Sequence, residues 1–189
     1  MNGASYEVKA SLLRSYIHQL QQRGLWNKVK ARVSPATLKH LDDPPLASTW
    51  IDGLVIEELI EALHAVGGVE AVKEVTKQGQ QIGLLAVVKP VVIGLLRLFG
   101  ATPPTLLSRF GDMSRSSLRG PVEFEWIADG LRSGRFRIHF VGRRNMPRSA
   151  FIGFQTAIQI VCELCGVAGT IAEAQLNGSG NGAVFHVSW

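Results

Sequence analysis

The two cysteines of this 189-residue chain, Cys162 and Cys165, form a C-x-x-C pair. Residues three apart on a helix share a face, so the two sulfurs could meet. A redox pair, half of a zinc site or acyl attachment point, and small apolar core residues are three alternatives. Gly166 places the pair at the C-terminal end of a predicted helix, where the helix dipole disfavours a thiolate. We therefore expect core packing and no metal site, with Cys162 and Cys165 as the only metal candidates.

No other residues are spaced as a catalytic set. The five histidines are scattered over the chain, at positions 18, 40, 64, 139 and 186, and none forms an H-x-x-x-H pair. Residues 178–182 contain G-x-G-x-G, but they join two predicted strands, whereas a dinucleotide-binding loop joins a strand to a helix. We therefore expect a protein that is not an enzyme.

Arginines carry the basic excess, because residues 89–148 hold eleven basic and four acidic side chains. Alternation with apolar neighbours puts some of them on one face of a strand, where glutamates of the preceding strand could pair with them. An exposed connector would hold the others. Solvated residues, an acidic protein or lipid headgroup, and nucleic acid are the alternatives. No nucleic-acid-binding motif is present, so we rank a solvated face first, an acidic protein or lipid headgroup second and nucleic acid last. The candidate patch consists of Arg135, Arg137, Arg143, Arg144 and Arg148.

The order of elements predicts how these residues are positioned. Alternating segments at 122–127, 135–140, 170–174 and 183–187, with a helix at 151–165, predict a β-β-α-β-β unit. Helical patterns precede it at 5–23, 36–41 and 50–66, where Gly67-Gly68 ends the third. Another helix starts at Val69, and residues 111–120 are expected to form a loop. The chain is therefore predicted to be one α+β domain, with residues 1–120 mainly helical and residues 121–189 forming the β-β-α-β-β unit. Its helices pack on a four-stranded antiparallel sheet.

Residues 82–99 form a mostly apolar run that is long enough to be a candidate membrane span. Lys89, Pro90 and Arg97 interrupt the run, and charges at the centre of a span are costly. We expect a kinked helix or a pair of helices in the protein core, and no membrane span. The start of the sequence lacks a basic segment leading into an apolar one, and there are only two cysteines. A cytoplasmic location is expected.

Several short motifs carry a family resemblance. They are the step Gly100-Ala101-Thr102-Pro103 after an apolar helix, Trp126 before a hairpin, a helix between two hairpins, and the ending at Trp189. The chain resembles the superfamily of vinyl-reductase-type ligand-binding domains, haem-nitric-oxide-binding domains and transport-particle (TRAPP) subunits. More narrowly, it is similar to a family of single-domain proteins from myxobacteria and their relatives.

The resemblance implies an apolar pocket between the helices and the sheet, and often a dimer. Relatives bind haem, aromatic molecules or acyl chains there. The tyrosine–serine–arginine motif that holds the haem propionates cannot be matched here, and no histidine has the context of a haem ligand. We therefore expect neither haem nor zinc. The expected pocket residues are Leu95, Phe99, Trp126, Phe136, Phe154, Ile158 and Cys162.

These observations predict a non-catalytic small-molecule-binding or sensory domain. An apolar small molecule or acyl chain would be its ligand, and a homodimer is expected. The alternative is an interaction or scaffold module whose apolar helices form a dimer, as in transport-particle subunits.

Overall fold

The computed structural model describes residues 5–83, 102–143 and 145–189. The helices are α1 (Ala10–Gln22), α2 (Trp26–Lys30), α3 (Pro35–Asp42), α4 (Gly53–Gly83), α6 (Pro103–Leu107), α7 (Phe110–Ser114) and α8 (Ala150–Leu164). The strands are β1 (Glu7–Lys9), β2 (Trp50–Asp52), β3 (Leu118–Arg119), β4 (Val122–Gly130), β5 (Ser133–Phe140), β6 (Thr170–Ile171), β7 (Gln175–Leu176) and β8 (Gly182–Ser188). Helices and antiparallel sheets confirm the predicted α+β class.

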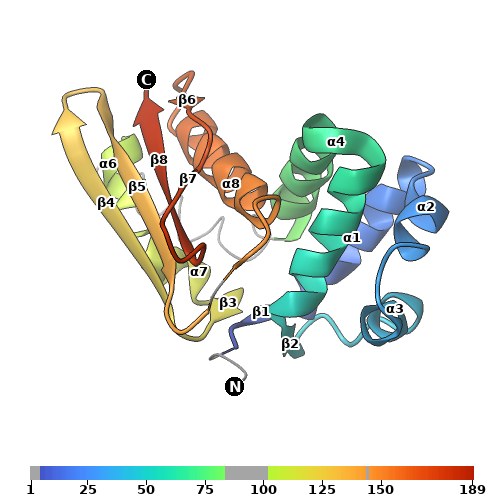
Figure 1. The fold of residues 1–189 in the computed structure, drawn as a ribbon. Coiled ribbons are helices and arrows are strands. Elements are labelled where there is room, and N and C mark those ends of the chain that lie inside the picture. The colour runs from blue at the N-terminus through green and yellow to red at the C-terminus, as the bar shows by residue number, and fades with distance from the viewer. Residues whose placement is uncertain (1–4, 84–101, 144) are drawn as a thin grey trace.

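The elements stack in layers, with α8 lying between the main sheet and α4 (Figure 1). Beyond α4 lies α1, and α2 and α3 follow at the far end of the molecule (Figure 1). Helix α8 can occupy this central position because Glu163 is its only charged residue. A helix that is apolar around most of its circumference is buried on several sides. Its two faces therefore join the sheet half of the protein to the helical half.

The main sheet has the strand order β4-β5-β8-β6, and β7 also pairs with β8. Phe136 in β5 lies opposite Trp126 in β4 and Phe185 in β8. Along β5, Phe136, Ile138 and Phe140 are buried, which confirms the predicted alternation. The sheet has five strands, one more than predicted, because residues 170–176 form two strands of two residues each.

A second, smaller sheet has the order β2-β1-β3, in which Val8 pairs with Ile51 on one side and Leu118 on the other. The sequence predicted helix at 5–23 and 50–66, so the first residues of both predicted helices are strands instead. The predicted loop at 111–120 also contains most of α7 and all of β3. Three-residue strands are too short to show a period of two, and their pairing with distant residues decides their conformation.

Helix α4 changes direction at Gly68, whose φ of 71° lies in the left-handed region that glycine tolerates. The predicted stop at Gly67-Gly68 is therefore a break between two helical segments that continue to Gly83. Within the described ranges, no helix combines the length and the apolar character needed to cross a membrane. Most of the apolar run at 82–99 lies outside those ranges.

Candidate functional site

An apolar pocket of about 160 Å³ lies along α8. The residues of α8 that line it recur at helical spacing: Ala150, Gly153, Phe154, Ala157, Ile160, Val161 and Leu164. The other described walls come from β1, α1 and α4, and from the segment that runs from α6 through α7 to β3. The pocket thus lies between segments that are far apart in the sequence.

Phe154 is the only predicted pocket residue among the described lining residues. Phe136, Ile158 and Cys162 are each 0% exposed and belong to the packed core. Trp126 packs near Trp189 instead, with the ring centroids 6.0 Å apart. Leu95 and Phe99 lie outside the described residues, as does the apolar face that was expected to form a dimer.

Phenylalanines pack between α8, α7 and the main sheet. Phe140 contacts Phe151 and Phe154 of α8, with ring centroids 6.3 and 5.8 Å apart. Phe110 of α7 packs on Phe124 and Phe136 of the sheet at 5.2 and 5.0 Å. The pocket lies beside this cluster, and Phe110 and Phe154 belong to both.

A buried ion pair forms one polar end of the pocket. Both carboxylate oxygens of Glu57 in α4 accept hydrogen bonds from Arg143 Nη2 at 2.8 Å. The side chain of Glu57 is 5% exposed and that of Arg143 is 15% exposed. Burial raises the pKa of Glu57, and the Arg143 charge opposes this shift only in part. The hydroxyl of Tyr6 also lies at this end and donates to the carbonyl of Gly53 at 3.4 Å.

Glu57 lines both the apolar pocket and an open polar groove on the surface. Asp52, Glu58 and Glu61 of this groove are acidic, and Arg143 contributes the opposite charge. Glu57 therefore lies between the apolar pocket and the polar groove, and Arg143 lines the groove side. The placement corrects one prediction, because Arg143 was expected on an exposed connector. Burial of its guanidinium against Glu57 removes it from the surface patch.

A second polar group consists of Tyr16 in α1 and of Thr76 and Gln80 in α4, all at most 8% exposed. Tyr16 and Gln80 line the pocket. The Gln80 amide nitrogen donates to the Gly153 carbonyl at 3.1 Å, while Gln80 Oε1 and Thr76 Oγ1 have no hydrogen-bond partner in the described part of the chain. Burial raises the pKa of Tyr16 well above its usual range, although the nearby Thr76 and Gln80 side chains act against this shift.

The sequence interpretation missed both polar groups. Thr76 and Gln80 follow Val72, a fully buried residue, at intervals of four, so all three share the buried face of α4. A polar residue in phase with an apolar stripe is the signal that could have revealed Gln80. For Glu57 no such signal exists, because its partner Arg143 is 86 residues away.

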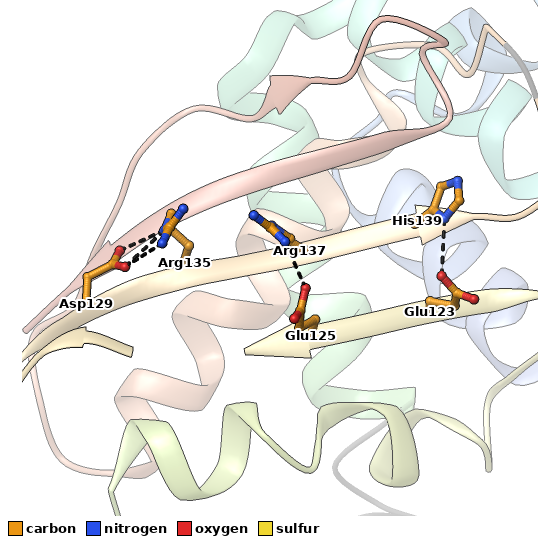
Figure 2. Close-up of polar contacts among 6 residues, drawn as sticks. All are labelled: Glu123, Glu125, Asp129, Arg135, Arg137 and His139. Atoms are coloured by element: carbon orange, nitrogen blue, oxygen red, sulfur yellow. Dashed lines mark hydrogen bonds and ion pairs between the residues drawn. The ribbon is translucent and has the colours of Figure 1, made fainter. Parts of the chain in front are cut away.

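The outer face of the main sheet carries a row of charge pairs (Figure 2). Arg137 donates to Glu125 at 3.1 Å, which confirms the predicted cross-strand pairing. Arg135 bonds both oxygens of Asp129 and holds the pKa of that carboxyl below its usual value. His139 lies 3.2 Å from Glu123 (Figure 2). Much of the positive charge of the predicted patch is thus neutralised within the sheet.

Two members of the predicted patch remain. Arg148 is exposed, and Arg144 lies outside the described residues. The anionic partner remains a prediction that now depends on these two side chains.

Both cysteines lie at the C-terminal end of α8, and burial raises the pKa of each thiol. For Cys165 the pKa rises to about 11. A raised pKa disfavours the thiolate that redox chemistry and metal binding need. Among the residues that the structure places, no three His, Cys, Asp or Glu side chains gather closely enough to hold a metal ion.

Comparison with known proteins shows which solved structures share this fold. No protein-family model matches the sequence, and no curated protein matches it. Among solved structures, 21 chains are similar. An unliganded Fe(II) H-NOX protein from K. algicida has a TM-score of 0.64 at 11% identity, over 95% of both chains. An oxygen-binding H-NOX domain related to soluble guanylate cyclases, in its oxygen complex, has a TM-score of 0.58 at 10% identity, over 95% of this chain and 94% of that one.

These comparisons contradict the expectation that haem is absent. H-NOX stands for haem-nitric-oxide binding, and another neighbour comes from work on haem distortion in the H-NOX family, with a TM-score of 0.59. The expectation relied on a missing sequence motif and on the local context of the histidines. At about 10% identity, short motifs are a poor guide to a fold that persists over nearly the whole chain. The missing motif is therefore no ground for excluding haem.

The described residues fit a haem only in part. Apolar walls suit a macrocycle, and Tyr6, Tyr16 and Met113 line the pocket with atoms of the kinds that can ligate haem iron. No histidine lines its described walls. The volume of about 160 Å³ is also below the roughly 300–1,000 Å³ that drug-sized ligands occupy. A histidine-held haem does not match these described walls.

The similarity to H-NOX structures extends over nearly the whole chain. The chain covers about 95% of the H-NOX structures to which it is similar, and these structures cover it to the same extent. Sequence identity is too low to transfer a ligand or an activity. The chain has the fold of H-NOX domains.

Proposed function

We propose that this protein is a non-catalytic ligand-binding domain with a sensory role, and that its ligand occupies the apolar pocket along α8. The observation that carries the proposal is the pocket itself, which has apolar walls and two buried polar groups. Such concave sites, with few polar groups, are typical of small-molecule binding. The H-NOX fold supports the choice, because one structure with this fold is an oxygen-binding domain in its oxygen complex.

The polar groups of the pocket support binding rather than catalysis. The titratable side chains among its described lining residues are Tyr6, Tyr16 and Glu57. Burial raises the pKa of both tyrosines, so they stay neutral and cannot act as bases near neutral pH. Glu57 is held by Arg143. The pocket therefore lacks a free base beside a nucleophile in its described walls.

Two classes of ligand follow from different observations. The fold comparisons favour haem, whereas the volume of the pocket and the absence of histidine from its described walls favour a smaller apolar molecule. Either ligand would use the same face of α8. A bound ligand would contact α8, which packs on both the main sheet and α4. A shift of α8 on ligand binding would therefore reach both halves of the protein.

The test is a titration of the protein with haem and with a set of small apolar molecules, followed by absorption spectra and thermal melting. We expect saturable 1:1 binding that raises the melting temperature. Ala157→Phe should abolish binding, because Ala157 lines the pocket and a phenyl ring would fill it. As the control, Ala62→Val changes a buried alanine that is not a described lining residue and should leave binding intact. Equal binding by the Ala157→Phe variant would place the ligand elsewhere and contradict the proposal.

A further inference from the structure

One buried oxygen in the pocket wall has unused hydrogen-bonding capacity. Gln80 is 8% exposed and lines the pocket, and its Oε1 atom has no hydrogen-bond partner among the residues that the structure describes. A buried acceptor without a partner is unfavourable, so polar atoms in protein interiors are almost always paired. The Tyr16 hydroxyl lies near the Gln80 side chain but makes no hydrogen bond to Oε1 among the described residues, so a ligand could supply the missing donor.

The hydrogen bond of the amide nitrogen determines which of the two side-chain amide atoms of Gln80 is the oxygen. Oxygen and nitrogen of a glutamine are assigned from the hydrogen bonds that they make. The Gln80 nitrogen donates to the backbone carbonyl of Gly153 at 3.1 Å, and exchanging the two atoms would put two acceptors face to face. Gln80 must therefore present an acceptor, and a matching ligand must present an N–H or O–H donor.

The other polar end of the pocket has less capacity to spare. Both oxygens of Glu57 already accept hydrogen bonds from Arg143, and the Tyr6 hydroxyl donates to Gly53. Removing Arg143 from Glu57 would leave two buried charges without partners. A neutral polar ligand group would therefore bond to Gln80 with less disruption than to Glu57.

The size of the pocket limits the rest of the ligand. A cavity of about 150 Å³ with apolar walls holds benzene. The pocket here has about 160 Å³ and walls such as Phe110, Phe154 and Ile60. Long acyl chains exceed this volume, whereas a single aromatic ring with one substituent does not.

From these observations we infer that the pocket selects a small aromatic molecule carrying one N–H or O–H donor, which Gln80 Oε1 accepts. The inference rests on the proposed function, because it names the ligand class of the same pocket. It treats Gln80 as the residue that determines specificity. The apolar walls supply the affinity that any molecule of this size would share.

Aniline and toluene are suitable probes, because they have nearly the same shape and only aniline has an N–H donor. We expect the wild-type protein to bind aniline at least about tenfold more tightly than toluene, since a site built around a hydrogen bond rejects the analogue that lacks it. The Gln80→Met variant should lose this preference and favour toluene, because the amino group of aniline would then be buried without an acceptor. Dissociation constants from NMR titration measure both ratios.

Gln19 provides a matched control. It is also a buried glutamine, 2% exposed, whose Oε1 lacks a described partner, but it is not among the described lining residues. Gln19→Met should keep the wild-type preference for aniline. If Gln80→Met does not fold, the aniline-to-toluene ratio of the wild type still tests the inference.

The outcomes of these titrations distinguish failure of the inference from failure of the proposed function. Equal affinities in the wild type would overturn the inference and indicate that Oε1 is satisfied by water. The inference also fails if haem binds at 1:1 and neither probe does, although the proposed sensory function then stands. Failure of every ligand to bind would overturn both. A preference lost in Gln80→Met and kept in Gln19→Met supports the inference.

Discussion

At the scale of single residues, Glu57 and Arg143 join α4 to the connector between β5 and α8. Their hydrogen bonds at 2.8 Å are almost completely removed from solvent. Charged pairs of this kind are expensive to break, because the remaining partner stays buried without a counter-charge. The pair is thus more important to the fold than the exposed pairs on the outer face of the sheet.

Replacing one partner of this pair tests its role. Glu57→Leu should lower the free energy of unfolding by about 3 kcal/mol, because Arg143 is left without its carboxylate. Adding Arg143→Met to Glu57→Leu should restore most of the loss, since no unpaired charge then remains. Urea denaturation measures both effects. Arg137→Gln, which breaks an exposed pair, should cause little change, and an equal loss there would contradict the argument from burial.

The pH dependence of stability should also report on Glu57. Because burial raises its pKa in the folded state, the folded protein binds more protons than the unfolded chain above pH 4.5, the usual value for this carboxyl. Wild type should therefore lose stability relative to Glu57→Gln as the pH rises from 4.5 through the raised pKa, and the difference should then level off. A relative gain with rising pH would show that the Arg143 charge outweighs burial. Equilibrium denaturation at a series of pH values measures the difference.

At the scale of elements, one glycine in α4 and one in α8 differ in how close the neighbouring side chains lie. A Cβ atom on Gly153 would lie 3.6 Å from Thr76 Cγ2, which is ordinary contact, whereas one on Gly79 would lie 2.4 Å from the Tyr16 ring. Gly153→Ala should raise the free energy of unfolding by about 0.5–1 kcal/mol, because alanine favours a helix. Gly79→Ala should lower it by about 1–3 kcal/mol through overpacking. Thermal and urea unfolding of the two variants would contradict the packing described if the effects had the same sign.

Elements with a clear period were predictable from sequence. Alternating residues in β5, a helix that ends in C-x-x-C and a break at Gly67-Gly68 all have the expected conformation. Strands β1, β2 and β3 were missed because two or three residues show no period and their pairing depends on distant partners. The face of α8 that lines the pocket was also missed. Since α8 is apolar on both its sheet side and its α4 side, its sequence alone cannot say which side is left unfilled.

At the scale of the whole molecule, the pocket borders a helix that contacts both halves of the described structure. Helix α8 lies between the main sheet and α4 (Figure 1). Residues from Ala150 to Leu164 of this helix line the pocket. The fold could be recognised from the order of elements, because layers follow from which faces are apolar. The sequence could not predict which polar groups meet inside the protein, because Tyr16, Gln80 and Gly153 come together only when α1, α4 and α8 pack.

Whether the pocket along α8 binds a ligand is tested most directly by native mass spectrometry of the protein purified from haem-supplied cells. We expect the mass of the polypeptide plus one small molecule, and the bare polypeptide mass for Ala157→Phe. Bare protein in every preparation, together with no uptake of haem, aniline or toluene, would contradict this expectation.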